Sequence, residues 1–396
     1  MKNVFLFLKK NIFIILSSIF FGLSIVFAYI IFNTMGYFGT SGNTMVGTIA
    51  ISNYETSQYP AIITSEVNEW RSDAIFTVSY QGYEYEIDLD LFALQIQDTI
   101  DGIGDGQENS VIFTLSDISK LTIENELELV FSEYIMSEID MDAFTEEIIK
   151  DMGYMNILKH YRLESFFSNN DLDMTVIDSV TITSLSSEDV NNIIDTLSVI
   201  QIDGNSRFSI LEKLGEYEFS NNQLSIIASG IQKITSETPF TGFVFSQNGI
   251  LPIWAEEGMN VMILKTNQYD FTFFNDLDLN YTVEIEQTSS TSIELRLVGY
   301  PFVADYSITK LDETVIPKII EYYENPDLDE TTEGIIIIDT AEETIFHLLV
   351  QEGLDGKIVC YTRTITLPDS TVLTEIIYRE IYYPTIEIYQ ENIVEK

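Results

Sequence analysis

The chain has 396 residues, of which 45% are hydrophobic, and its formal net charge is −44 at pH 7. This length and apolar content are sufficient for two or three domains with cores of their own, and they exclude a disordered chain. The negative charge excludes nucleic acid as an expected partner, because the electrostatic attraction that drives such binding is reversed. The single cysteine, Cys360, excludes an intrachain disulfide.

The segment 11–32 predicts a transmembrane helix. It contains no charged residue, and about 20 residues with a rise of about 1.5 Å each span the roughly 30 Å core of a bilayer. Three lysines precede the segment, whereas the next basic residue after it is Arg71, so we expect a cytoplasmic N-terminus and an extracellular body. Residues 29–35 form a poor cleavage site, which favours an uncleaved single-pass anchor in the cell membrane over a signal peptide.

Beyond the anchor, helical and strand patterns predict an α+β chain with a β-rich C-terminal end. We expect a stub and anchor over 1–39, an α+β region over 40–178, a second module over 179–303, and a linker with a β-rich module over 304–396.

The region 40–178 begins with a short strand at 45–51, which is followed by a helix whose residues Ile63, Val67 and Trp70 share one face. Two strands, 75–80 and 83–88, flank Gln81-Gly82 and predict a hairpin. Further helices are expected at 89–100, at 123–134, at 144–152 after the capping candidate Asp140, and at 155–167.

The later chain changes to a mainly β pattern. A strand is expected at 175–183, and amphipathic helices are expected from residue 187 and at 222–234. The alternating segments 279–286 and 292–298 predict a hairpin with one buried face. Residues 305–332 are expected to form an open connection, and residues 335–390 an all-β module.

One stretch has a specific order of residues. Gly258-Met259-Asn260-Val261 precedes the segment 269–275 (Tyr-Asp-Phe-Thr-Phe-Phe-Asn), and a hairpin then closes on Val298-Gly299-Tyr300-Pro301. This order resembles the C-terminal half of VanW-family envelope proteins. The matching motif positions are Phe208, Ser209, Gln223, Asp270 and Asn275.

The resemblance has implications for the neighbouring modules. Residues 45–178 are similar to the region to which peptidoglycan binding is attributed in many such membrane-anchored proteins. The tail over 304–396, with Gly353 and Gly356, is similar to the strand-rich G5 domain that follows VanW modules in some of them. The resemblance therefore implies an envelope protein, with peptidoglycan or another envelope polymer as a partner.

The departures from the family pattern bear on catalysis. Asn222 occupies the family's cysteine position, and residues 218–221 replace its glycine-rich run. The histidine that family members carry beyond that helix is missing from 235–246. Any family chemistry that needs this cysteine and histidine is therefore not expected here.

Other catalytic and metal sites are disfavoured by the residue types. Cys360 and His347 lie in expected strands and His160 in an expected helix, which favours packing over a nucleophile pair, and one cysteine with two histidines is too few for a common zinc site. The acidic clusters 101–108 and 169–173 lack the spacing of a calcium loop, so solvated turns are the favoured interpretation. No catalytic, cofactor or metal residue is assigned.

Three hairpin tyrosines are candidates for contact with a glycan. Tyr80, Tyr83 and Tyr85 could stack on sugar rings and hydrogen-bond through their hydroxyl groups, although packing within the fold is the favoured alternative.

The sequence thus predicts a non-catalytic, membrane-anchored extracellular protein with an envelope-binding or structural role. Two alternatives stay open: a cell-wall-modifying enzyme that uses carboxylates of the VanW-like module, and a calcium-dependent adhesin or scaffold.

Overall fold

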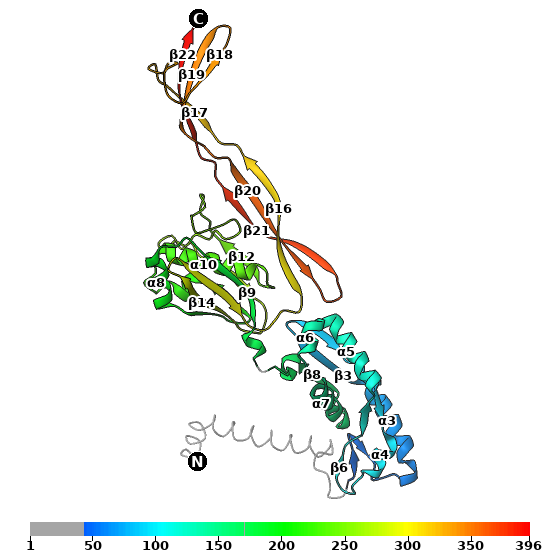
Figure 1. The fold of residues 1–396 in the computed structure, drawn as a ribbon. Coiled ribbons are helices and arrows are strands. Elements are labelled where there is room, and N and C mark those ends of the chain that lie inside the picture. Colours follow the sequence, from blue (N-terminus) through cyan, green and yellow to red (C-terminus); the bar gives the residue numbers. More distant parts are fainter. Residues whose placement is uncertain (1–42, 170) are drawn as a thin grey trace, which may run out of the picture. The chain divides into compact units, whose positions relative to one another are not determined.

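The computed structural model describes residues 43–169 and 171–396, and the expected anchor lies outside these residues (Figure 1). Within the described part, no helix is both long and apolar enough to cross a membrane. The chain divides into two compact units. The first contains residues 43–77, Glu86–Ile123 and Met141–His160, and the second contains Val78–Tyr85, Glu124–Asp140 and Tyr161–Lys396.

The first unit is built around helix α3 (Tyr59–Asp73), which has Pro60 in its first turn. Ile63, Val67 and Trp70 are buried as predicted, and Trp70 Nε1 donates a hydrogen bond of 2.9 Å to the carbonyl of Asn156. The other elements that lie wholly in this unit are β1 (Met45–Val46), β2 (Ile49–Ala50), β5 (Phe92–Leu94), α4 (Ile96–Asp101), β6 (Glu108–Asn109), β7 (Phe113–Leu115) and α7 (Met141–Gly153).

Three predictions for this part of the chain are wrong in detail. The strand expected at 45–51 is a small hairpin of β1 and β2, because Gly47 has a positive φ of 55° and turns the chain. The helix expected at 89–100 is confined to α4, since Phe92–Leu94 pairs with β7 as a strand. The helix expected at 155–167 is strand β8 (Leu158–Arg162) followed by a 3₁₀ turn.

Several elements contain residues of both units. These are β3 (Ile75–Tyr80), β4 (Tyr83–Glu86), β8 and α5 (Asp117–Phe131), and the expected hairpin at Gln81-Gly82 is present as β3 and β4. The short helix α6 (Glu133–Ser137) follows α5 after a break at Ser132, whose φ is 71°. This break ends the helix expected at 123–134 three residues early, and Tyr134 has 51% of its surface exposed.

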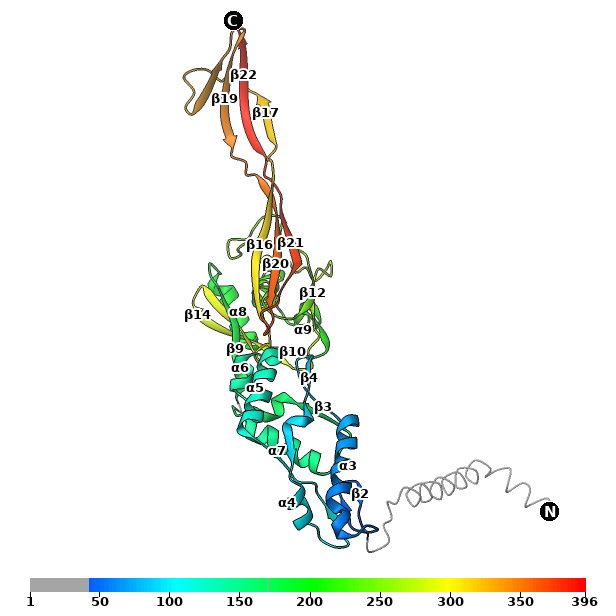
Figure 2. The same cartoon turned by 90° about the vertical axis from the view of Figure 1, so that its right-hand side faces the viewer.

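The second unit contains a four-stranded sheet with the order β10-β14-β15-β9 and a three-stranded sheet with the order β11-β13-β12. Strands β9, β10, β12 and β14 are labelled in Figure 2. The predicted hairpin is confirmed as β14 and β15. The bounds are β9 (Val176–Ile182), α8 (Ser187–Thr196), β10 (Val199–Ile202), β11 (Ser206–Ser209), α9 (Ile210–Leu214), α10 (Asn221–Ser236), β12 (Thr241–Phe245), β13 (Phe271–Asn275), β14 (Tyr281–Ser289) and β15 (Ser292–Val298).

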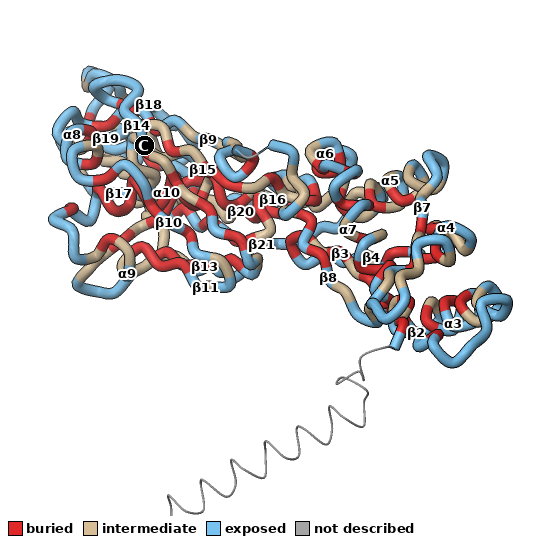
Figure 3. Tube along the Cα trace, turned by 90° about the horizontal axis from the view of Figure 1, so that it is seen from below, coloured by how far each residue is buried: buried red, intermediate tan, exposed pale blue. Residues whose placement is uncertain are grey.

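Helix α10 is largely buried (Figure 3). It also carries a stripe of polar side chains. The side chains of Asn221, Ser225 and Ser229 accept hydrogen bonds of 3.1, 2.9 and 2.9 Å from the backbone amides of residues 265, 263 and 261. Four helical residues advance by about 6 Å and two extended residues by about 6.6 Å. The steps match, so these hydrogen bonds form a ladder between a helix and an extended chain.

An aromatic cluster fills the space between the two sheets. Phe208 stacks on Phe273 with ring centroids 4.7 Å apart, and Phe240 contacts both Phe273 (5.3 Å) and Tyr281 (5.4 Å). All four side chains are at most 2% exposed, which makes this cluster the main apolar core around the motif positions.

The tail is all-β, as predicted. Its sheets have the orders β16-β20-β21 and β17-β22-β19-β18. In the second sheet Ile336 and Ile337 are 49% and 48% exposed, and since neighbouring residues of a strand point to opposite faces, both faces are accessible. The bounds are β16 (Asp305–Ile316), β17 (Ile320–Glu324), β18 (Ile335–Asp339), β19 (Glu343–Gln351), β20 (Gly356–Thr366), β21 (Val372–Tyr382) and β22 (Glu387–Glu395).

The open connection expected at 305–332 is wrong, because β16 and β17 occupy much of it. β16 pairs antiparallel with β20 through 11 residue pairs, with a register shift between Lys310 and Asp312, and β17 pairs parallel with β22.

Candidate functional site

Ser209 and Asp270, two of the motif positions, cap a helix. The Ser209 hydroxyl lies 2.5 Å from Asp270 Oδ2 and accepts a 3.0 Å hydrogen bond from the amide of Glu212 in α9. Asp270 Oδ1 accepts from the amides of Leu211 (3.0 Å) and Phe271 (2.8 Å). These interactions satisfy the first amides of α9. The Asp270 carboxylate is therefore part of the fold.

The other motif positions are also structural. Asn275 is fully buried, and its amide group donates to the carbonyls of Asp203 (3.1 Å) and Leu279 (2.9 Å). Gln223 forms a reciprocal capping box with Ser220 at the start of α10. Phe208 lies in the aromatic cluster, so the structure brings all five motif positions into one module. The polar groups of the other four are used in hydrogen bonds within the fold.

The position of the expected cysteine is also occupied by a polar contact. Asn222 accepts a 3.3 Å hydrogen bond from Trp254 Nε1 and donates one of 3.3 Å to Asp189. Cys360 is buried in β20, whereas His347 lies in another sheet, 3.3 Å from Glu391. His160 lies in strand β8 rather than in the expected helix, and its Nδ1 atom is 2.9 Å from Thr77 Oγ1.

The acidic loop 101–108 is closed by protein groups. Asn109 accepts a 2.8 Å hydrogen bond from the amide of Gly104 and donates one of 2.9 Å to the carbonyl of Met45. Among residues 43–169 and 171–396, no group of three or more His, Cys, Asp or Glu side chains is placed to hold a metal ion. The second acidic cluster, at 169–173, includes residue 170, which is not described.

The three hairpin tyrosines differ in environment. Tyr80 is only 2% exposed and donates a 2.9 Å hydrogen bond to the carbonyl of Pro301, so it is not accessible to a glycan. Tyr83 is half-buried and shares a hydrogen bond with Tyr306, and Tyr85 bonds to Glu126. Contact of Tyr83 and Tyr85 with a glycan stays a prediction.

Gln81 is a structural residue that the sequence reading treated only as part of a turn. Its side-chain amide donates to the Pro301 carbonyl (2.9 Å) and the Tyr281 hydroxyl (3.1 Å), and its Oε1 accepts from the amide of Val303 (3.2 Å). Gln81 has a φ of 51° and is 7% exposed. The sequence carries no signal for this role, because the burial of Gln81 and its partners near residues 281 and 301–303 exist only in the fold.

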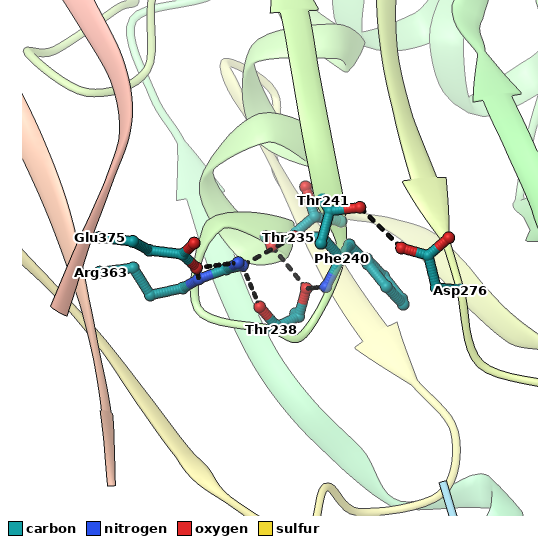
Figure 4. A network of polar contacts seen from close by, with 7 residues as sticks. All are labelled: Thr235, Thr238, Phe240, Thr241, Asp276, Arg363 and Glu375. Carbon is teal, nitrogen blue, oxygen red and sulfur yellow. Dashed lines mark hydrogen bonds and ion pairs between the residues drawn. The ribbon is translucent and has the colours of Figure 1, made fainter. Parts of the chain in front are cut away.

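A buried arginine connects strand β20 to the end of α10 (Figure 4). Arg363 is 3% exposed and donates to the carbonyls of Thr238 and Phe240, the second at 2.8 Å. Its Nε and Nη2 atoms lie 2.9 and 2.5 Å from Glu375 Oε1. The guanidinium group thus joins two tail strands to the module.

A second polar contact between tail and module involves Glu380. This side chain is 0% exposed, and its Oε2 accepts hydrogen bonds from the amide of Gly258 (2.8 Å) and the hydroxyl of Tyr382 (2.6 Å). Burial raises the pKa of the Glu380 carboxyl group above its usual range, which favours the protonated form. At the edge of this contact, the hydrogen bond from Lys357 lowers the pKa of Glu257.

A groove of about 640 Å³ lies in the second unit, in the size range of small-molecule sites. We call it the α6–β16 groove. It is lined by residues 132–134 at the start of α6, 175–177 of β9, Glu237 after α10, the segment 301–306, residues 366–368 and Ser370. These residues carry no sequence signature of a site, because they come from distant segments without a shared motif.

Comparison with known proteins gives no family match, and the structural neighbours include two G5 domains. No family model matches the chain, and no curated protein matches it. The solved G5 domain of an IgA1 protease is 27% identical in a match that covers 24% of this chain and 92% of that domain, with a TM-score of 0.16. The solved HP0197-G5 structure is 18% identical and covers 22% of this chain and 95% of its own, with a TM-score of 0.14.

Both neighbours are G5 domains, the class that the resemblance implies for residues 304–396. A likeness at these TM-scores establishes neither a fold nor a function for this chain. The likeness to VanW-family proteins stays a resemblance.

Proposed function

We propose that this chain is a membrane-anchored extracellular protein of the VanW-like type with a non-catalytic role in binding or supporting an envelope polymer such as peptidoglycan. The proposal that the role is non-catalytic rests on one observation. The polar side chains at the motif positions are engaged in capping α9 and α10 and in a buried contact of Asn275. A carboxylate that holds backbone amides in the resting fold is poorly suited to transfer protons during a reaction.

The anchor and the surface charge support the location. The uncharged segment 11–32 is preceded by three lysines, and the body that follows is strongly acidic, which favours a polymer partner without dense phosphate charge.

Co-sedimentation with isolated cell-wall polymer tests the binding role. The full-length chain should sediment with the polymer more strongly than an acidic control protein of similar size. Equal sedimentation of the two proteins would contradict wall binding.

One observation favours the enzyme as a second candidate. Burial raises the pKa of Asp178, and the charge of Glu237, which lines the α6–β16 groove, acts in the same direction, whereas the amide of Ser179 and the charge of Lys233 lower it. A carboxyl group with a raised pKa beside a second carboxylate is the arrangement that general acid catalysis uses. Release of soluble fragments from cell-wall polymer, abolished by Glu237→Gln, would support this candidate and contradict the non-catalytic proposal.

A further inference from the structure

The α6–β16 groove combines one exposed and two half-buried aromatic rings with carboxylates. We propose that it binds a glycan whose sugars carry free amino groups. This inference rests on the envelope-binding role proposed above and names the ligand class for one site.

Aromatic rings lie on different segments of the groove lining. Tyr134 of α6 is 51% exposed, and Phe302 and Tyr306 lie in the segment 301–306 with ring centroids 5.9 Å apart. The Tyr306 hydroxyl bonds to Tyr83, and its ring lies 5.6 Å from the buried Arg363 guanidinium, so this ring is held in place. Partly exposed rings offer apolar faces to the C–H faces of sugars.

The charges of the lining have one sign. Glu133 of α6, Glu237 after α10 and Asp305 of β16 line the groove, and no Lys, Arg or His is among the lining residues. Arg363 lies nearby but is occupied by Glu375 and two backbone carbonyls. A ligand with phosphate or carboxylate groups is therefore repelled, whereas protonated amines are attracted.

Neutral hydrogen-bonding groups complete the lining. Thr175, Thr366 and Ser370 bear hydroxyl groups that can donate to and accept from the hydroxyl groups of a sugar. Aromatic faces, hydroxyl groups and carboxylates together match an amino sugar, which presents an apolar ring face, hydroxyl groups and a positive charge. A neutral N-acetylated sugar uses the first two but not the third.

The inference can be tested by calorimetry with the full-length chain and a glucosamine hexamer, with the N-acetylglucosamine hexamer and tetralysine as comparison ligands. The groove variant carries Glu133→Gln, Glu237→Gln and Asp305→Asn. The control variant carries Glu188→Gln, Asp195→Asn and Glu218→Gln, three exposed positions outside the groove lining, and it has the same net charge. In the described part of the chain, the side chains of these six residues make no hydrogen bond and no ion pair, so neither variant removes a polar contact of the fold.

The glucosamine hexamer should bind more tightly than the acetylated one. Each exposed charge pair contributes a factor of about two to five, so the groove variant should bind about tenfold more weakly or worse, and the control variant should bind as the unmodified chain does. Tyr134→Ala should weaken both hexamers without changing the thermal melting temperature, because this ring is half exposed.

Several results would overturn the inference. They are equal weakening in the groove and control variants, tighter binding of tetralysine than of the glucosamine hexamer, or no binding of the hexamer. If the groove variant still sediments with cell-wall polymer as the unmodified chain does, the groove inference fails and the envelope-binding proposal stands. If the unmodified chain binds the hexamer but not the polymer, the envelope-binding proposal fails instead.

Discussion

Replacement of Arg363 by alanine should loosen the contact between strand β20 and the end of α10. The guanidinium group makes two buried hydrogen bonds to the carbonyls of Thr238 and Phe240 (Figure 4). A hydrogen bond that involves a charged group contributes about 1.5–3 kcal/mol, so losing two costs about 3–6 kcal/mol before relaxation. Water that enters the vacated space can bond the carbonyls, so we expect the lower end, about 3 kcal/mol.

The ion pair with Glu375 contributes little to this cost. The Glu375 side chain is 46% exposed, and pairs at such positions are typically worth up to about 1 kcal/mol. Glu375→Gln is therefore the matched control, because it removes the charge pair but leaves the two carbonyl contacts in place.

Hydrogen exchange measured by mass spectrometry is the suitable assay, since a chain with two compact units does not guarantee a single unfolding transition. Peptides that cover 235–245 and 356–366 should exchange about 100-fold faster in the alanine variant, because about 1.4 kcal/mol corresponds to a factor of ten. Glu375→Gln should change exchange by fivefold or less. If the alanine variant exchanges no faster than Glu375→Gln, the carbonyl contacts do not hold this junction.

Three further predictions concern other buried polar groups. Because the pKa of Glu380 is raised in the fold, its contribution to stability is present below the usual glutamate pKa and is lost as pH rises through the folded value. The Glu380→Gln variant should therefore melt at a higher temperature than the unmodified chain at pH 8 and at the same temperature near pH 4. A variant that melts at a lower temperature at pH 8 would contradict this reasoning. Gln81→Asn keeps a residue that tolerates a positive φ but is too short to reach Pro301, so it should cost about 1–3 kcal/mol, seen as faster hydrogen exchange in peptides that cover 78–86 and 299–305. Asp270→Asn weakens the cap of α9 and should lower the melting temperature while leaving sedimentation with cell-wall polymer unchanged; lost sedimentation in a folded variant would point to a direct role of this carboxylate.

Long periodic segments were predictable from the sequence. Helix α10 and the β14–β15 hairpin follow their predicted ranges closely, because each buries one or more regular rows of apolar side chains. Strand β16 was missed because most of its sequence, from Thr309 to Ile316 (Thr-Lys-Leu-Asp-Glu-Thr-Val-Ile), lacks a clear alternation of apolar and polar residues. The residues 155–167 were mistaken for a helix, since a short strand and a turn can mimic helical spacing.

The candidate site could not be predicted in the same way. The motif positions were identifiable as a set, but their roles as caps and buried contacts depend on backbone amides that no sequence pattern reveals. The α6–β16 groove draws its lining from α6, the start of β9, Glu237 after α10, the start of β16 and the end of β20, and such a site exists only once these segments have folded together.

The ladder between α10 and residues 261–265 limits which changes of chain length the module can accept. Deleting one residue within the helix would rotate every later position by about 100°, and deleting one from the extended segment would turn its amides to the opposite side. Either deletion would disconnect Ser225 or Ser229 from its amide, whereas replacing serine by threonine keeps a hydroxyl acceptor. Natural variants of this module should therefore show substitutions along the ladder. Insertions and deletions should occur in the loop between β12 and residue 257.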